Sequence, residues 1–136
     1  APRQPLIASR SRGLLKLDRL LDGTMLDPLQ QFSHAWVVFL FHENTDAGKH
    51  DPASDHPFKG IRARVRPPRA KGQSMGVFAT RTPHRPNPVG LSLVAVDRVD
   101  VRRRCVHVSG LDLVDGTPIL DIKPFLPTYD VPAAGA

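Results

Sequence analysis

Runs of β-branched and aromatic residues limit the fold of this chain more than any other feature. The run AWVVFLFH, at residues 35–42, is apolar up to its final histidine. The run VGLSLVAVDRVDV, at 89–101, turns through the basic residues VRRR into CVHVS, at 105–109. We expect the first run to form a strand buried on both faces, and the other two to pair as an antiparallel hairpin.

Shorter segments complete an all-β pattern. Alternating and turn-bounded residues predict four further strands, at 12–17, 62–66, 76–80 and 118–125. Residues 26–34 predict a short helical turn, with Asp27 as its cap and Pro28 at its first position. The expected fold is therefore all-β, a compact β-barrel or a sandwich of six or seven short, mostly antiparallel strands with one or two short helices.

Length and composition set the organisation of the chain. Its 136 residues suit one domain, residues 1–136, and the polar, turn-rich segment 43–60 predicts a long, mobile insertion loop. Cys105 is the single cysteine, so no intramolecular disulfide can form, and we expect a reducing, cytoplasmic setting. No run approaches the roughly 18 apolar residues of a membrane span, so no membrane partner is expected.

Positive charge is concentrated in one part of the sequence. The formal net charge is +6, and residues 56–96 contain eight Lys or Arg and no Asp or Glu. The eight are Lys59, Arg62, Arg64, Arg66, Arg69, Lys71, Arg81 and Arg85. A segment that repels itself in this way is stabilised by an anionic partner, most commonly phosphate. The alternative is a solvated basic surface without a partner.

The loop FATRTPHRPNPVG, at residues 78–90, combines basic side chains with a stiff backbone. Three prolines fix φ and reduce the entropy of the unfolded chain: Pro83, Pro86 and Pro88. Arg81 and Arg85 are therefore expected to be preorganised for bidentate binding of carboxylate or phosphate. His84 could stack on a base or donate to phosphate, and Asn87 could present its amide or cap the turn. The alternative is a rigid loop that only faces solvent.

A second constellation lies in SGLDLVDGTPILDIKPF, at residues 109–125. Asp112, Asp115 and Asp121 sit among apolar residues, and Asp115-Gly116 is a turn signal. A carboxylate at a buried edge needs a partner, and the basic loop could supply one. Alternatively, Asp115 only makes the turn and Asp121 pairs with Lys123 or an arginine. His42, at the end of the apolar run, is likewise either a structural histidine or a catalytic one.

Several common chemistries are excluded by spacing. No two glycines are two positions apart, so a Gly-x-Gly-x-x-Gly nucleotide turn is absent, and so is a Gly-x-x-x-x-Gly-Lys phosphate loop. The six histidines show no His-x-x-x-His pair, and one cysteine cannot build a zinc knuckle, so no metal is expected. No Gly-x-Ser-x-Gly elbow occurs for a serine hydrolase.

Five motifs in order resemble the TsaA-like, or TrmO, family. They are PRQP (2–5), FSHAWVVFLFH (32–42), RVRPPR (64–69), GVFATRTPHRPNPVGLSLV (76–94) and SGLDLVDGTPILDIKPF (109–125). The resemblance implies a β-barrel tRNA methyltransferase that uses S-adenosylmethionine without a Rossmann fold and works as a homodimer. It implies methylation of the exocyclic amine of threonylcarbamoyl-adenosine next to the anticodon. Members generally begin with one more strand and bacterial ones carry a C-terminal domain, so we expect an excised domain.

The resemblance also assigns roles by position. Donor-binding segments of the family match Arg3, Gln4, Pro5, Phe41, His42, Arg81, Leu91, Asp112, Leu113, Val114, Asp115 and Gly116. Contacts to tRNA are expected from Arg62, Arg64, Arg66, Arg69, Arg85 and Asn87. Arg81, Asp112 and Asp115 are the catalytic candidates, and the proton acceptor stays open among Asp112, Asp115 and His42. We expect the arginine loop and the aspartate-glycine bend to meet at the barrel rim.

Two other functions fit part of the same pattern. A non-enzymatic RNA-binding barrel would use the basic strip at residues 59–85 and would lack a donor pocket. A small-molecule methyltransferase would use the donor site but would leave the basic strip without a role.

Overall fold

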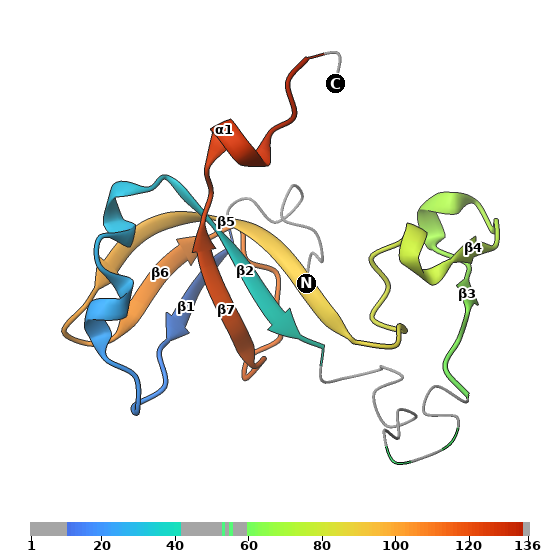
Figure 1. The fold of residues 1–136 in the computed structure, drawn as a ribbon, viewed down its shortest axis with the longest axis horizontal. Coiled ribbons are helices and arrows are strands. Elements are labelled where there is room, and N and C mark those ends of the chain that lie inside the picture. Colours follow the sequence, from blue (N-terminus) through green and yellow to red (C-terminus); the bar gives the residue numbers. More distant parts are fainter. Residues whose placement is uncertain (1–10, 42–52, 54, 56–59, 135–136) are drawn as a thin grey trace. The chain divides into compact units, whose positions relative to one another are not determined.

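A computed structural model describes residues 11–41, 53, 55 and 60–134 (Figure 1). The chain divides into two compact units, Ala1–Val38 with Leu91–Ala136, and Phe39–Gly90. We refer to them as the sheet unit and the loop unit. The prediction of a single domain stays a prediction. The predicted loop at 43–60 lies outside the described residues except at 53, 55 and 60.

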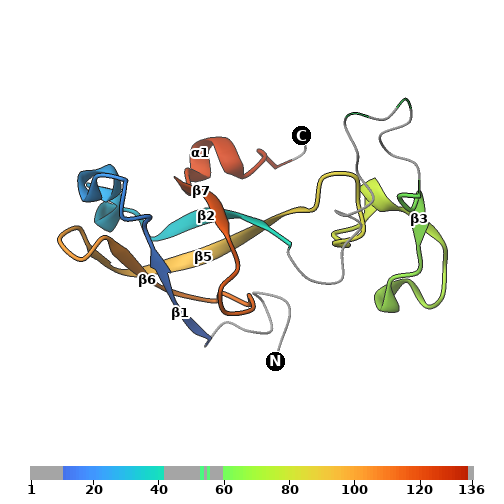
Figure 2. The same ribbon diagram turned by 90° about the horizontal axis from the view of Figure 1, so that it is seen from below.

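A five-stranded sheet forms the main body of the fold (Figures 1 and 2). Its strands are β1 (Arg12–Lys16), β2 (His34–Leu40), β5 (Val89–Asp100), β6 (Cys105–Ser109) and β7 (Ile119–Pro124), in the order β1-β6-β5-β2-β7. The predicted β5–β6 hairpin is confirmed, and β1 pairs with β6 antiparallel. The prediction of an all-β fold is confirmed. Within the described ranges β1 and β7 are the two edges of the sheet, so no closed barrel is found.

The β5–β6 hairpin contains a β-bulge. Val96 pairs with Val108, but the next pair is Arg98 with His107, so Asp97 is an extra residue in β5. A bulge of this kind reverses the alternation of the strand beyond it. Val94 lies on the core side before the bulge, whereas Arg98 and Asp100 share a face with His107 and Cys105 after it.

The core lies on one face of the sheet. It consists of Leu15, Leu26, Leu29, Ala35, Val37, Val94, Val106 and Val108, all at most 9% exposed. Burial of such apolar side chains is the main stabilising contribution to a fold of this size. The sheet residues among them alternate with outward-facing ones, as the pleat requires.

The helical turn predicted at 26–34 is in fact two 3₁₀ turns, η1 (Gly23–Leu26) and η2 (Leu29–Gln31), which bring Leu26 and Leu29 into the core. The prediction of Asp27 as cap was wrong. Asp22 caps η1, since its Oδ1 accepts a hydrogen bond from the Thr24 amide at 2.9 Å, and this bond lowers the pKa of Asp22. Pro28 is the cap residue of η2 rather than its first residue.

Strand β2 is buried on one face and half-buried on the other, which corrects the prediction of burial on both. Ala35, Val37 and Phe39 are buried, and the residues between them are partly exposed. Trp36 lies edge-on to Phe125 at 5.9 Å and donates to Asp130 Oδ2 at 2.9 Å. Asp130 ends α1 (Pro127–Asp130), a short helix that no sequence signal indicated. Hydrogen bonds from the Leu126 amide and Trp36 lower the pKa of Asp130.

The loop unit contains little regular structure. Strands β3 (Arg64–Val65) and β4 (Met75–Gly76) form a two-residue ladder, much shorter than the predicted strands at 62–66 and 76–80. Pro67 lacks an amide donor and leads into the 3₁₀ turn η4 (Pro68–Ala70), so β3 cannot continue. Residues predicted as strand after Gly76 instead form η5 (Val77–Ala79).

Candidate functional site

The arginine loop at residues 78–90 is held by its own polar groups. Arg85 Nη1 donates to the carbonyl oxygens of Thr80 and Thr82, at 3.1 and 3.3 Å. The same guanidinium lies over the ring of Phe78, with 6.0 Å from Cζ to the ring centroid. Arg85 therefore braces the loop, a role that the prediction of a tRNA contact did not include.

Two threonines extend this bracing. Thr80 Oγ1 donates to the Val77 carbonyl at 2.9 Å and accepts from the Thr82 amide at 3.3 Å. Thr82 Oγ1 accepts from the His84 amide at 3.2 Å. Sequence reasoning missed both residues, although the spacing Thr-x-Thr beside the prolines is a signal for local side-chain to backbone bonds.

Arg81 is exposed, and in the part of the chain that the structure describes it makes no hydrogen bond or ion pair. Its guanidinium therefore has all of its donors available for a ligand. Asn87 is also exposed, and its carbonyl oxygen accepts from the Val89 amide at 2.7 Å. The braced loop thus presents one free arginine on a backbone that its neighbours hold.

Tight packing fixes the end of the arginine loop. The amide of Phe41 donates to the Pro88 carbonyl at 2.8 Å, and the rings of Phe39 and Phe41 meet edge to face at 5.0 Å. A Cβ at Gly90 would come within 2.2 Å of the Phe39 ring, so only glycine fits there. Phe41, a predicted donor contact, is therefore set in place by the strand end.

A pocket of about 520 Å³ lies within the loop unit. Its lining is mostly apolar and consists of Ile61, Arg62, Ala63, Gly76, Val77, Phe78, Ala79 and Pro86. Phe78 is 79% exposed, which is unusual for a large aromatic side chain. Sequence reasoning assigned no role to Phe78. Its position as the first residue of the arginine loop was the available signal.

Of the four arginines at 62–69 that were predicted to contact tRNA, only Arg64 lies in a strand. Arg64 donates from Nε to Ser74 Oγ at 2.7 Å and from Nη2 to the Ser74 carbonyl at 2.9 Å, and Arg66 donates to the Gly72 carbonyl at 2.7 Å. These two therefore also fix the turn between β3 and β4. Arg62 and Arg69 are exposed in the same unit.

The predicted aspartate-glycine bend lies between β6 and β7 in the sheet unit. Asp112 Oδ2 is fully buried and has no hydrogen-bond partner among the described residues. A buried carboxylate oxygen without a partner is costly, which favours a ligand or a moving group that donates to it. Val114, Asp115 and Gly116 are exposed, and Leu113 is half-buried. Gly116 has φ +81°, as the predicted turn requires.

The entry to this bend is set by close packing. The amide of Gly110 donates to the Ser11 carbonyl at 2.7 Å, and Gly110 has φ +81°. Leu111 covers Gly13 of β1 so closely that a Cβ there would lie 2.6 Å from Leu111 Cδ2. Thr117 closes the bend through a hydrogen bond from its amide to the Val114 carbonyl at 3.1 Å. The backbone on both sides of Asp112 is therefore fixed.

The remaining predicted residues belong to neither the arginine loop nor the bend. Leu91 is an exposed residue of β5, and Asp121 pairs with Lys123 at 3.5 Å, as the sequence allowed. Arg3, Gln4, Pro5 and His42 lie outside the described residues. No helix among the described residues has the length and apolar character to cross a membrane. Over those same ranges, no three His, Cys, Asp or Glu side chains gather as a metal site would require.

Comparison with known proteins identifies the family. The family described as tRNA-methyltransferase O N-terminal domain matches residues 1–131. A Mus musculus protein named tRNA (adenine(37)-N6)-methyltransferase is 42% identical over 134 residues, which cover 96% of this chain and 28% of that protein. A Pseudomonas aeruginosa protein named putative S-adenosylmethionine-dependent methyltransferase RcsF is 46% identical over 132 residues, covering 96% of this chain and 49% of that protein.

Comparison with a solved structure gives the same family. The crystal structure of TrmO from Pseudomonas aeruginosa matches with a TM-score of 0.69 and 38% identity, covering 99% of this chain and 51% of that one. The chain therefore spans about half, or less, of the length of these relatives. The resemblance seen in the motifs is confirmed, and the chain belongs to the TrmO N-terminal domain family.

Proposed function

We propose that this chain is the methyl-transferring part of an S-adenosylmethionine-dependent tRNA (adenine-N6)-methyltransferase that acts on adenine 37. The observation that carries the proposal is the match over residues 1–131 to a family whose relatives carry that name. As the specific substrate we propose threonylcarbamoyl-adenosine, methylated on its exocyclic amine.

The aspartate-glycine bend at 112–116 has a group that suits the methyl donor, S-adenosylmethionine. S-adenosylmethionine offers hydroxyl and ammonium donors, and none of the residues that the structure describes donates to the buried Asp112 Oδ2. A charge-assisted hydrogen bond to this oxygen would compensate for its burial. We assign donor binding to Asp112 with the backbone of residues 113–116, and to Arg81, Phe41 and Leu91. Arg3, Gln4, Pro5 and His42 remain assigned through the family motif.

The arginine loop fits the substrate. A threonylcarbamoyl group carries a carboxylate, which the planar guanidinium of Arg81 matches in a bidentate manner. Arg85 keeps the loop in shape by binding the Thr80 and Thr82 carbonyls. Little entropy is then lost when Arg81 binds an anion. The basic residues at 62–69 supply contacts to tRNA phosphates, and Asn87 is a further candidate contact.

Bound S-adenosylmethionine supplies an electrophilic methyl group on a sulfonium. The protein contributes chiefly by positioning, which can lower a barrier by roughly 7 to 11 kcal/mol when the reacting atoms are held about 3 to 3.5 Å apart. The amine must also release a proton. Asp112, Asp115 and His42 are the candidate acceptors: Asp112 is buried at Oδ2, Asp115 is exposed, and His42 lies outside the described residues.

Labelled methyl transfer tests this function. The full chain is incubated with labelled S-adenosylmethionine and tRNA that either carries or lacks the threonylcarbamoyl group at adenosine 37. We expect incorporation only into the modified tRNA, and a loss of at least about 100-fold in Arg81→Ala, because misplaced reactants cost about that much. Equal labelling of both tRNAs would refute the threonylcarbamoyl substrate. Labelling of a metabolite pool and not of tRNA would favour a small-molecule methyltransferase.

The non-enzymatic alternative and the homodimer need separate measurements. An RNA-binding protein without a donor site would bind tRNA but would not bind S-adenosylmethionine. We propose a homodimer from the family resemblance, and light scattering of the chain at several concentrations would give its mass in solution.

A further inference from the structure

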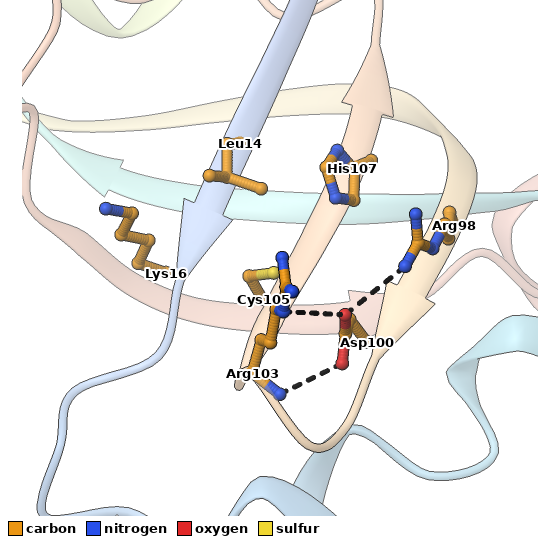
Figure 3. Close-up of a pocket in the computed structure, with 7 residues that line it drawn as sticks. All are labelled: Leu14, Lys16, Arg98, Asp100, Arg103, Cys105 and His107. Carbon is orange, nitrogen blue, oxygen red and sulfur yellow. Dashed lines mark hydrogen bonds and ion pairs between the residues drawn. The ribbon is translucent and has the colours of Figure 1, made fainter.

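A second concave site lies on the outer face of the sheet, opposite the core (Figure 3). It has a volume of about 390 Å³ and is lined by Leu14, Lys16, Arg98, Asp100, Arg103, Cys105 and His107. All seven belong to the sheet unit. None of them belongs to the donor or substrate residues assigned above.

The strand register explains why these side chains gather. Two rows cross the strands β1, β6 and β5: Leu14, His107 and Arg98 form one, and Lys16, Cys105 and Asp100 form the other. Neighbouring strands are about 4.8 Å apart, so each row places its outer members roughly 10 Å from each other. Six of the seven lining residues thus occupy sheet positions, and Arg103 lies in the turn between β5 and β6.

The bulge at Asp97 is what brings charge to this face. Without the extra residue, Arg98 would continue on the core side with Val94 and Val96. The bulge turns Arg98 and Asp100 outward instead, and Val99 takes the core-facing position. Bulges often re-aim functional side chains in this way. The Asp97 carboxylate is itself held by Ser109 Oγ at 2.9 Å and Arg12 at 3.6 Å.

Asp100 orders the cations of the site (Figure 3). Its Oδ2 lies 3.3 Å from Arg98 Nη2 and 3.9 Å from Arg103 Nε, and its Oδ1 accepts from the Arg103 amide at 2.9 Å. The Asp100 side chain is only 14% exposed, whereas Arg98 and Arg103 are 66% and 83% exposed. The carboxylate therefore lies beneath two guanidinium groups whose remaining donors face solvent.

The charge balance favours an anionic ligand. The lining holds three cationic side chains, Lys16, Arg98 and Arg103, and one carboxylate, so the site carries a net charge of about +2 before His107 is counted. Leu14, which is 45% exposed, and the buried Cys105 give an apolar floor. A cationic rim around such a floor suits a nucleotide unit, with its phosphate at the rim and its sugar or base on the floor.

We propose that this outer face of the β1–β6–β5 sheet is a second RNA contact site, which binds the phosphate backbone of the tRNA through Lys16, Arg98 and Arg103. This inference rests on the proposed function for the identity of the RNA. It concerns a surface separate in sequence from the basic strip at 59–85. RNA recognition on an open sheet face with basic and stacking side chains is a common mode.

Salt-dependent tRNA binding by the full chain tests the site. In Lys16→Ala/Arg98→Ala we expect affinity to fall by about three- to tenfold near 0.1 M salt, and the slope of log K against log salt to become shallower by about 1.4 to 1.8, for two lost phosphate contacts. Asp100→Asn should act in the opposite direction and tighten binding, because it removes the one negative charge while keeping the acceptor for the Arg103 amide. Two effects of opposite sign cannot both arise from partial unfolding.

Lys123→Ala is the matched control, because Lys123 is an exposed strand lysine, on β7, that already pairs with Asp121. Wild-type binding and slope in all three pocket substitutions would overturn the inference, as would an equal loss in Lys123→Ala. A wild-type chain without affinity for tRNA would also overturn it. Binding of S-adenosylmethionine is measured in parallel: if it is absent while the pocket variants still alter tRNA binding, the methyltransferase proposal fails and the RNA site stands.

Discussion

The β5–β6 hairpin and the arginine loop at 78–90 keep their shapes by different means. The hairpin has a ladder of backbone pairs, and its Val94, Val106 and Val108 are at most 1% exposed. Residues 78–88 of the arginine loop belong to no strand, and their backbone is held by hydrogen bonds of the Thr80, Thr82 and Arg85 side chains. Apolar burial therefore dominates the stability of the first, and polar side chains determine the conformation of the second.

This difference predicts that stability and activity can be changed separately. A substitution in the core of the sheet unit should lower the free energy of unfolding of that unit. A substitution of a bracing side chain should leave the free energy of unfolding nearly unchanged and should lower activity, because the loop would present Arg81 less precisely.

The largest expected effect on stability is that of Leu26→Ala. Leu26 is 4% exposed and packs in the core, so truncation leaves a cavity and should lower the free energy of unfolding by about 2 to 5 kcal/mol. Urea titration followed by circular dichroism measures this. The control is Leu20→Ala, at a leucine that is 85% exposed, with an expected change below about 0.5 kcal/mol. Equal losses in both variants would contradict the assigned core.

Among substitutions that act only through the shape of the arginine loop, Arg85→Ala has the largest expected effect on activity without loss of fold. We expect methyl transfer to fall by about 100-fold, through misplacement of Arg81, while unfolding changes by about 1 kcal/mol or less. Arg85→Lys should recover little, since an ammonium cannot reproduce a planar donor over Phe78 that bonds two carbonyls.

Limited trypsin digestion gives an independent readout of this bracing. Release of the loop in Arg85→Ala should accelerate cleavage after Arg81, whereas a residue that only contacts substrate would leave the cleavage rate unchanged. A wild-type cleavage rate in Arg85→Ala would show that Arg85 does not hold the loop.

Lowering the pH should have a smaller effect, on the stability that the hydrogen bonds of Asp130 contribute. Asp130 has a folded-state pKa below its ordinary value of 3.8, so the contribution of its bonds to stability is present above that value and is lost as pH falls through the folded pKa. Trp36, the single tryptophan, donates to Asp130 and reports this by fluorescence. We expect a change below about pH 4 that is absent in Asp130→Asn. The same change in that variant would assign it to another group.

The strands could be predicted where the local sequence pattern agrees with the strand pairing in the sheet. The hairpin at 89–109 follows from β-branched runs, and the strands at 12–16 and 119–124 follow from alternating or turn-bounded residues. The bulge at Asp97 could not be predicted, because a single extra residue depends on the register with β6 rather than on composition. Strand β2 looked fully buried because its run is apolar throughout, but one face is only half covered.

The sequence identified the residues of the candidate site but not the role of each one. Charge and proline content indicated a preorganised arginine loop, but residue types alone could not show that Arg85 is bonded to carbonyls of that loop while Arg81 is free. Asp112 and Asp115 looked equivalent in sequence. Only the packing around the bend distinguishes Asp112, whose Oδ2 is buried without a partner in the described part of the chain, from the exposed Asp115.

Calorimetric titration with S-adenosylmethionine tests the central claim most directly. The wild-type chain should bind the donor, Asp112→Asn should bind it at least about tenfold more weakly, since a hydrogen bond to a charged group contributes about 1.5 to 3 kcal/mol, and Asp121→Asn should bind like wild type. Wild-type affinity in Asp112→Asn would remove Asp112 from the donor site. No heat of binding in the folded wild-type chain would contradict the assignment of methyl transfer to this chain.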